Sequence, residues 1–355
     1  MNYKKQIKKA KEIKKQKFLS TGSTILNLAI SDKVNGGFPI GMYTRVCGDS
    51  DTGKTWIVLT CLAEAALNEN FQDYRLIYDP VENGALMDFV KYFGEDMASK
   101  LEMPRNDAAS ESLEDFYHNV NRAINVGKPF IYILDSMDAL ETKSELQLDN
   151  DNLKRADKGK KESQSYGTGK AKINSKKLGP LVSKLKKTDS ILIIISQSRA
   201  NIGAIGHADK KTVSGGNALK FHAAVNIWLS KKKTLKKEVR KKDRTIGLIA
   251  QVKVVRTRIT GKKTTIDVPI LYEIGIDDIS ANVEYLIDEN EWKKEKGKIK
   301  AIGLLKKPMF KENLIRYIEE KGLQRKLRKI VGKVWKEIDE SLFTGRVNKY
   351  ANKKD

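Results

Sequence analysis

The octapeptide GDSDTGKT at residues 48–55 has the residue types and the spacing of a loop that holds nucleotide phosphates. It fits G-x-x-x-x-G-K-[ST], in which backbone N–H groups surround the phosphates, the lysine contacts the β and γ oxygens and the hydroxyl reaches Mg²⁺. The sequence therefore predicts a site for ATP and Mg²⁺, with Thr55 as a metal ligand. The residues of this site are Gly48, Asp49, Ser50, Asp51, Thr52, Gly53, Lys54 and Thr55.

Two carboxylates and one amide follow apolar segments that read as buried strands. Asp135 ends PFIYILD and is predicted to hold Mg²⁺, as the carboxylate at that place does in phosphate-loop ATPases. Because Ser136 follows it, the usual neighbouring glutamate is missing, and Glu82, just past YRLIYD, is the predicted general base. Gln197 follows SILIIIS and is predicted to contact the γ-phosphate.

Less specific interpretations of these residues stay open. The octapeptide would then be a glycine-rich turn that happens to contain a lysine. Glu82 would be a solvated carboxylate in a turn, and Gln197 a polar residue at the end of a strand.

The elements that must position these residues are strands alternating with helices. Residues 43–47 are β-prone and residues 55–69 carry apolar side chains at helical spacing, so the octapeptide joins a strand to a helix. Because strands separated by helices pair in parallel, the sequence predicts an α/β fold with a mostly parallel twisted sheet and helices on both faces. Further strands are expected at residues 74–82, 129–136, 190–198, 223–232 and 246–259, and helices at residues 20–30, 110–126 and 178–189.

Two long segments, residues 144–177 and 199–216, resist this alternation. Both are polar, punctuated by glycine and rich in lysine. Because loops of this length inside a compact domain are usually functional or disordered, we predict two functional loops.

The composition favours a polyanionic partner. Among 355 residues, 68 lysines and arginines oppose 45 aspartates and glutamates, which leaves a formal charge of +23. The alternative is a general excess of lysine from an AT-rich genome, although the lysines are clustered. Apolar residues make up 40% of the chain, enough for one large α/β domain with a smaller appendage.

Other residue types exclude several classes of protein. Cys47 and Cys61 are expected to be reduced and buried, and the three histidines lack the spacing of a zinc site. No stretch approaches the roughly 18 consecutive apolar residues of a membrane span, and no signal-peptide core follows the basic amino terminus. The expectation is a cytoplasmic protein without a membrane partner.

The two ends of the chain differ from its centre. Residues 4–19 read as a basic helix, and two amphipathic helices are expected at residues 306–322 and 323–343. The predicted parts are a basic helix with a connector at residues 1–34, an ATPase core at residues 35–287 and a small, basic, α-rich carboxy-terminal domain at residues 288–355.

Several segments occur in an order and spacing that resemble the RecA family, that is, bacterial RecA and its phage relatives. They are STGS, GDSDTGKT, YDPVE, YILDS, ISQSRANIG, SGGNALKF, QVKVVRTR and ILYEIGI, and they extend the resemblance from residue 20 to about residue 300. SGGNALKF is the most specific of them. The resemblance implies a RecA-like P-loop ATPase core and an ATP-dependent homologous recombinase. Such a protein polymerises on single-stranded DNA as a helical filament and exchanges strands with a homologous duplex.

Matched residue by residue, the resemblance implies further roles. Glu82 resembles the catalytic glutamate, and Gln197 resembles the residue that senses the γ-phosphate. Phe89 lies where the family stacks an aromatic ring on adenine. Arg256 and Arg258 replace two family lysines that reach the ATP of the neighbouring subunit, so we expect both arginines to be catalytic.

The same resemblance implies two DNA-binding loops, at residues 156–177 and 198–215. A filament on single strands needs a cationic groove along the phosphates, and the first loop is rich in lysine. An apolar side chain such as Ile202 can wedge between stretched base steps. The expected partners are single-stranded and double-stranded DNA and further copies of the chain. The predicted DNA-binding residues are Lys170, Lys172, Lys176, Arg199, Ile202, Gly203, Gly215 and Gly216.

The sequence departs from the bacterial pattern in two further places. YDPVE has one residue more between its aspartate and its glutamate, and the chain ends in the basic segment RVNKYANKKD, where the family commonly has an acidic tail. A basic tail suits a phage-encoded protein. Two alternatives stay open: a RecA-like regulatory module that assembles on DNA with ATP but exchanges no strands, and a hexameric helicase-type motor. An intact first loop and a glutamine-led second loop favour the recombinase.

Overall fold

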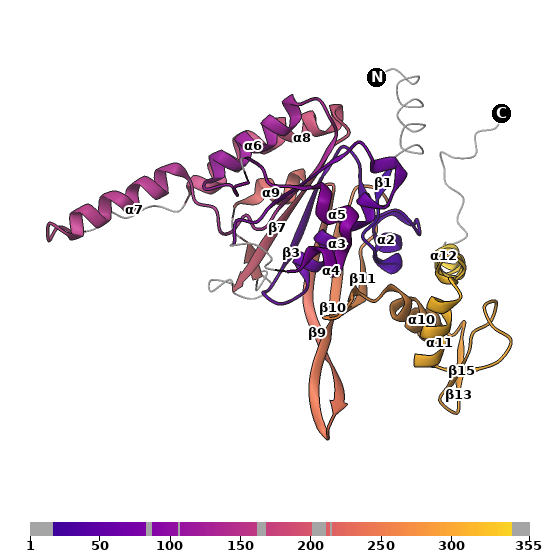
Figure 1. Cartoon of the computed structure of the whole chain (residues 1–355). Helices are drawn as coiled ribbons and strands as arrows, with labels where there is room; N and C mark the ends of the chain where they lie inside the picture. The colour runs from indigo at the N-terminus through magenta and orange to yellow at the C-terminus, as the bar shows by residue number, and fades with distance from the viewer. Residues whose placement is uncertain are drawn as a thin grey trace, which may run out of the picture.

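A large twisted sheet with helices on both faces forms the centre of the protein (Figure 1). The computed structural model describes residues 17–82, 87–105, 107–161, 168–200, 211–213 and 215–342, with the backbone alone for residues 199–200 and 211–212. A long helix and a long hairpin project from this centre, and the carboxy-terminal helices lie beside it (Figure 1). The predicted α/β fold with a mostly parallel sheet is confirmed.

Neighbouring strands in the middle of the sheet run parallel. In sheet order they are β9 (Val225–Val239), β3 (Tyr43–Gly48), β7 (Ile191–Ala200), β6 (Phe130–Leu134), β4 (Arg75–Asp79) and β5 (Leu101–Glu102). The antiparallel strands are β10 (Lys242–Thr257), β11 (Thr264–Leu271) and β12 (Gly275–Ile276) beyond β9, and β8 (Lys211–Val213) beside the end of β7. The carboxyl ends of β3, β4, β6 and β7 therefore meet at one edge, where a ligand is expected.

Helices cover both faces of the sheet. On one face lie α2 (Thr24–Ser31), α3 (Lys54–Ala66), the 3₁₀ turn η1 (Glu69–Phe71), α4 (Phe89–Phe93) and α5 (Glu95–Lys100), and on the other lie α6 (Leu113–Asn125), α8 (Gly169–Lys187) and α9 (Asn217–His222). In β7, Ile191, Ile193 and Ile195 pack against the first group, whereas Leu192 and Ile194 pack against the second. Because side chains alternate across a strand, one continuous apolar run serves both layers.

Residues 144–177, predicted as one polar loop, are largely helical where the structure describes them, so that prediction is wrong. The helix α7 (Lys143–Ala156) projects from the body and has no buried residue (Figure 1). It begins at a capping box, in which the Thr142 hydroxyl accepts the Glu145 N–H at 3.2 Å and the Glu145 carboxylate accepts the Thr142 N–H at 2.9 Å. Since no residue of the helix is buried, it has no apolar period, and only the T-K-S-E signature marks its start.

β9 and β10 continue beyond the core as one antiparallel hairpin (Figure 1). The sequence predicts strands only over residues 223–232 and 246–259, whereas the two strands pair as far as Val239 and Lys242. The additional part is exposed and rich in lysine, so its strand conformation comes from cross-strand pairing and not from burial. The turn residues have positive φ values, which match the twist of a two-residue hairpin turn.

The amino-terminal part differs from the prediction at its described end. β1 (Phe18–Leu19) pairs with β2 (Phe38–Pro39), so the helix expected at residues 4–19 does not include its last two residues. The rest of that expected helix, up to residue 16, lies outside the described residues.

The carboxy-terminal part contains a small sheet besides its helices. Its elements are α10 (Asp278–Asp288), β13 (Lys293–Glu295), β14 (Lys298–Lys300), β15 (Met309–Phe310), α11 (Lys311–Glu320) and α12 (Gln324–Ser341). The Asp278 carboxylate accepts the Thr24 N–H at 2.6 Å and the Arg328 Nε–H at 3.1 Å. The Lys262 ammonium donates to Asp32 at 2.7 Å and to Asp339 at 2.6 Å. These ionic contacts hold α12 against the start and the end of α2.

Two expectations about residue types can be compared with the structure. Cys47 and Cys61 are both buried as free thiols, as expected. Among the described residues, none of the helices combines the length and the apolar character needed to cross a membrane.

Asp79, the last residue of β4, holds a buried hydrogen-bond cluster that is expected to stabilise the fold. Its carboxylate accepts the Ser110 N–H at 2.8 Å, the Ser110 hydroxyl at 2.6 Å and the Tyr132 hydroxyl at 2.6 Å. Burial raises the pKa of Asp79, and these hydrogen bonds oppose the shift. Asp79→Ala would leave the three donors without an acceptor, so we expect a loss of about 3 kcal/mol in the free energy of unfolding, measured by urea titration. Asp73→Ala, on the exposed turn before β4, is the control and should change stability little.

Candidate functional site

The predicted phosphate loop connects β3 to α3 at the carboxyl edge of the sheet. Gly53 caps α3 with a φ of 88°, and a Cβ atom there would lie 2.3 Å from Ile270 Cδ1, so only glycine fits. The first N–H groups of α3 have no partner within the helix and can bind phosphate oxygens. Asp51, the atypical member of the loop, has a φ of 55° and an exposed side chain.

Lys54 is the buried cation of the loop, with 7% of its surface exposed. Its Nζ donates to the Asp49 carbonyl oxygen at 2.5 Å. Burial lowers the pKa of Lys54, while the carboxylates of Asp135, Glu82, Asp49 and Asp138 act in the opposite direction. Because phosphates would add negative charge to a site that already holds these carboxylates, a divalent cation would offset the repulsion between them.

The two predicted metal ligands lie together. The Thr55 hydroxyl donates to Asp135 Oδ2 at 2.9 Å, and the Tyr78 hydroxyl donates to the same oxygen at 3.1 Å. Burial raises the pKa of Asp135, while these two hydrogen bonds lower it. Hydroxyl and carboxylate oxygens are hard ligands, which Mg²⁺ takes in small number while it keeps several waters. The donor set therefore fits Mg²⁺.

Glu82 follows β4, Ser136 follows β6 and Gln197 lies near the end of β7, and the three meet at this edge. The Gln197 Nε2 atom is 2.8 Å from both carboxylate oxygens of Glu82, and the Ser136 hydroxyl donates to Glu82 Oε1. The Glu82 N–H donates to the Asp135 carbonyl at 3.2 Å, which holds the turn after β4 against the end of β6. The extra residue in YDPVE thus leaves the predicted base in direct contact with the predicted γ-phosphate sensor.

Two further contacts tie the end of β7 to its surroundings. The Gln197 N–H donates to Asp138 Oδ2 at 2.6 Å, and the Ser198 hydroxyl donates to the Asp49 carboxylate of the phosphate loop. Sequence reasoning assigned no role to Asp138, which belongs to no motif, or to Ser198, which lies in ISQSRANIG without a role of its own. The one available signal was a second acid, Asp138, three residues after Asp135.

Aromatic residues lie near the start of α3. Phe89, predicted to stack on adenine, begins α4, is partly buried and packs edge-on against Tyr78, with ring centroids 6.3 Å apart. Sequence reasoning missed Tyr272, an exposed residue in the turn between β11 and β12. That turn follows Ile270, which contacts the phosphate loop at Gly53. Tyr272 is therefore a second aromatic candidate for contact with a base, and its place in ILYEIGI was the available signal.

Comparison with known proteins decides the family. A family model described as the RecA N-terminal domain matches residues 4–277. The chain belongs to the RecA family. Among curated relatives, Protein RecA of Clostridioides difficile (strain 630) is 29% identical over 283 residues, which cover 77% of this chain and 72% of the relative. Protein RecA of Ehrlichia chaffeensis is 26% identical over 344 residues, which cover 95% of this chain and 86% of the relative.

The two arginines predicted to act on a neighbouring subunit, Arg256 and Arg258, lie far from the phosphate loop of their own chain. Thr257, which lies between them, pairs with Val225 of β9, and Val225 pairs with Thr44 near the start of β3. The phosphate loop begins at Gly48, four residues or about 13 Å further along β3. Arg256 Nη1 and Arg258 Nη2 donate to the Phe221 carbonyl oxygen at 3.2 Å and 2.6 Å. Both guanidinium groups thus contact the carboxyl end of α9 at the opposite edge of the sheet.

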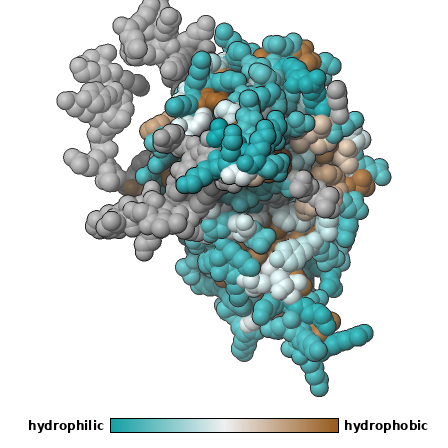
Figure 2. Space-filling view, turned by 90° about the vertical axis from the view of Figure 1, so that its left-hand side faces the viewer, coloured by the Kyte–Doolittle hydropathy of each residue, from teal (hydrophilic) through white to brown (hydrophobic). Residues whose placement is uncertain are grey.

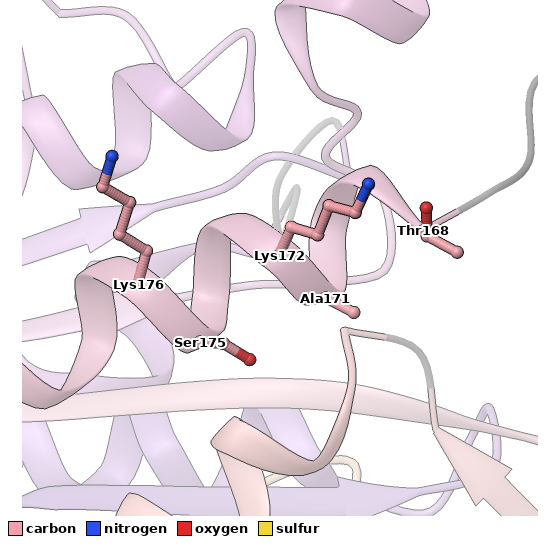
Figure 3. Close-up of a pocket in the computed structure, with 5 residues that line it drawn as sticks. All are labelled: Thr168, Ala171, Lys172, Ser175 and Lys176. Carbon is pink, nitrogen blue, oxygen red and sulfur yellow. The ribbon is translucent and has the colours of Figure 1, made fainter.

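Three of the predicted DNA-binding lysines lie on α8. Figure 3 shows Lys172 and Lys176 on the same side of the helix, one turn apart, beside a hollow. Both are exposed, whereas Lys170 is partly buried and its Nζ donates to the Asp138 carbonyl oxygen at 3.1 Å. The residues that line the hollow are Thr168, Ala171, Lys172, Ser175 and Lys176.

The other predicted DNA-binding residues belong to the second segment. Gly215 and Gly216 precede α9 with φ values of 89° and 81°, a conformation that favours glycine. Arg199 lies in β7, where its backbone pairs with β8. Ile202 and Gly203 lie outside the described residues.

Proposed function

We propose that the chain is an ATP-dependent homologous recombinase, which polymerises on single-stranded DNA, exchanges strands with a homologous duplex and hydrolyses ATP in response to DNA. The contact between Glu82 and Gln197 carries this proposal, since it joins the predicted base to the strand that leads into the second DNA-binding loop. Membership of the RecA family supports it.

Residues of the phosphate loop would bind and orient the triphosphate of ATP. The N–H groups at the start of α3 would bind phosphate oxygens, and Lys54 would leave the Asp49 carbonyl for the β and γ oxygens. Thr55 and Asp135 would hold Mg²⁺, which when bound neutralises charge on the phosphates. Tyr78 would keep Asp135 oriented through its hydrogen bond.

Glu82 would accept the proton of the attacking water. Its Oε1 atom accepts hydrogen bonds from Ser136 and Gln197, whereas Oε2 accepts one from Gln197 and keeps a lone pair that can take a proton. An oxygen of the γ-phosphate is an alternative acceptor for the Gln197 amide and would draw that amide away from Glu82. Because β7 runs from Gln197 into the second loop, this movement would link the nucleotide state to DNA.

The surface supports a polyanionic partner. Figure 2 shows that the face carrying α7 is covered mostly by hydrophilic side chains, with apolar residues scattered among them. The lysines of α8 and the exposed, lysine-rich part of the β9–β10 hairpin add positive charge. Because cationic contacts with phosphate release counterions, we expect binding of single-stranded and double-stranded DNA to weaken steeply with salt.

The position of Arg256 and Arg258 supports assembly into a filament. Both lie at the edge of the sheet opposite to their own phosphate loop, where a neighbouring copy could present its ATP.

We further propose that the chain acts in the cytoplasm. Its proposed parts are an amino-terminal connector at residues 1–34, an ATPase core at residues 35–287 and a carboxy-terminal domain at residues 288–355.

The proposal is tested by ATPase rates with and without single-stranded DNA, followed by a strand-exchange assay and negative-stain microscopy. We expect DNA to stimulate hydrolysis, helical filaments to form and strands to be exchanged. Six-membered rings would support a helicase-type motor instead. Filaments that exchange no strands would support a regulatory module.

Gln197→Ala is expected to weaken the coupling between ATP and DNA. The variant lacks the amide that would move between Glu82 and the γ-phosphate. The stimulation of ATP hydrolysis by DNA and the increase in DNA affinity caused by ATP should therefore fall together. Since coupling between binding sites is reciprocal, the tightening of DNA binding by ATP and the tightening of ATP binding by DNA should fall by the same factor, equivalent to about 1–3 kcal/mol. Both are measured at one fixed salt concentration, with the exposed Gln72→Ala as control. Loss of one effect with full retention of the other would contradict the coupling role.

A further inference from the structure

A polar cluster joins the inner ends of the two predicted DNA-binding loops. Asp138, after β6, accepts the Gln197 N–H with its carboxylate at 2.6 Å and the Lys170 ammonium with its carbonyl oxygen at 3.1 Å. One turn along α8 from Lys170, the Asn174 amide donates to the Gly215 carbonyl oxygen at 2.8 Å. Each end of the second loop is therefore attached, directly or through Asp138, to α8, whose first half belongs to the first predicted loop.

Asn174 attaches the end of the second loop firmly. Its side chain is fully buried, and its Oδ1 accepts the Tyr117 hydroxyl at 2.8 Å, so the amide is held on both sides. A buried amide strongly favours the arrangement in which its donors and acceptors are paired. Gly215 fits closely, since a Cβ atom there would lie 2.6 Å from Leu219 Cδ1 and 3.0 Å from Asn174 Nδ2.

Asp138 fixes the start of the second loop. A hydrogen bond from a backbone N–H to a carboxylate is stronger than one between neutral groups, so it holds the Gln197 backbone in place. The Gln197 side chain in turn contacts Glu82. Asp138 thus lies between Lys170, a predicted DNA contact, and the amide that engages the predicted base.

We propose that Asp138 and Asn174 are positioning residues, which attach Gln197 and Gly215 to α8 and transmit DNA binding on α8 to Gln197. This inference rests on the proposed function, because it names the route by which DNA would stimulate hydrolysis. A strand bound to the lysines of α8 fixes that helix. Through Asp138 and Asn174, the fixed helix then sets both ends of the loop that begins at Gln197.

The test is Asp138→Asn in the full chain, with Asn174→Leu as a second variant. Asp138→Asn keeps the size of the side chain and can still accept the Gln197 N–H, but it replaces a charge-assisted hydrogen bond by a weaker neutral one. Asp138 is only partly buried, so the fold should tolerate the change. We expect the stimulation of hydrolysis by oligothymidylate to fall, and the tightening of oligothymidylate binding by ATP to fall by about 5- to 150-fold, the usual range of coupling between binding sites.

In Asp138→Asn, the melting temperature should stay at the parent value and the nucleotide affinity without DNA should not fall, since the change removes one negative charge that acts on Lys54. Asn174→Leu should lower the melting temperature, because the buried Tyr117 hydroxyl and the Gly215 carbonyl oxygen lose their partner, so its stimulation is measured at a temperature at which it stays folded. A purely structural role of Asp138 would lower both quantities in Asp138→Asn instead.

Asp149→Asn is the matched control, since it removes the same charge from the exposed face of α7. This control should hydrolyse ATP with the same stimulation by DNA as the parent protein. A double variant, Asp138→Asn with Gln197→Ala, should lose no more stimulation than Gln197→Ala alone, because both changes interrupt one route. Parent-like stimulation in Asp138→Asn and Asn174→Leu would overturn this inference and leave the recombinase proposal intact. A parent protein whose hydrolysis does not respond to DNA would overturn both.

Discussion

Glu82→Gln is expected to lower the rate of ATP hydrolysis by about 10²- to 10⁴-fold while nucleotide stays bound. Glutamine has the same shape and can still form hydrogen bonds with Ser136 and Gln197, but it cannot accept the proton of the attacking water. Binding depends on Lys54 and Thr55, which the substitution does not alter. Filaments assembled with ATP should therefore persist, because the hydrolysis that would release them is stalled.

The experiment measures phosphate release, binding of labelled ATP and the lifetime of filaments after dilution. Glu69→Gln is the control, since Glu69 is an exposed residue of η1 outside the candidate site. It should hydrolyse ATP at the parent rate. A parent-like rate in Glu82→Gln, with ATP bound, would show that another group is the base.

The sheet and the phosphate loop could be predicted because their signals are local. The buried strands are nearly unbroken apolar runs, and β3, the loop and α3 follow one another in the sequence. The prediction failed for elements that bury no apolar face of their own. α7 has no buried face, so its start at Thr142 is marked by a capping box alone. The outer half of the β9–β10 hairpin is held by pairing between strands, which no single segment reveals.

The candidate site could be predicted only in part for a related reason. Lys54, Thr55 and Asp135 carry recognisable motifs, whereas Asp138 and Asn174 act through contacts with residues 41 to 59 positions away. Such partners become neighbours only when β6, β7 and α8 are packed. Residue patterns therefore indicated the chemistry at the nucleotide, and the structure was needed to find the side chains that join it to the DNA-binding loops.

Arg256 and Arg258 are expected to act on the ATP of a neighbouring protomer. Both are held at the carboxyl end of α9, at the edge of the sheet opposite to their own phosphate loop, so neither can reach its own nucleotide. Burial and the charge of Arg256 lower the pKa of Arg258, but a guanidinium stays charged at neutral pH. Arginines supplied in trans stabilise charge on the γ-phosphate and contribute about 10³- to 10⁵-fold to hydrolysis. We expect a loss of that size in Arg256→Ala,Arg258→Ala.

Mixing variants separates action in trans from a role in binding DNA. Arg256→Ala,Arg258→Ala protomers keep an intact phosphate loop, and Lys54→Ala protomers keep intact arginines, so ATPase activity should return where the two intact halves meet. A chain carrying all three substitutions should give no recovery in either mixture. Arg240→Ala,Lys241→Ala, at the exposed end of the hairpin, removes the same charge and should weaken DNA binding without loss of hydrolysis at saturating DNA. If mixed filaments form at every ratio and none regains ATPase activity, the arginines bind DNA and do not act on the ATP of the neighbouring protomer.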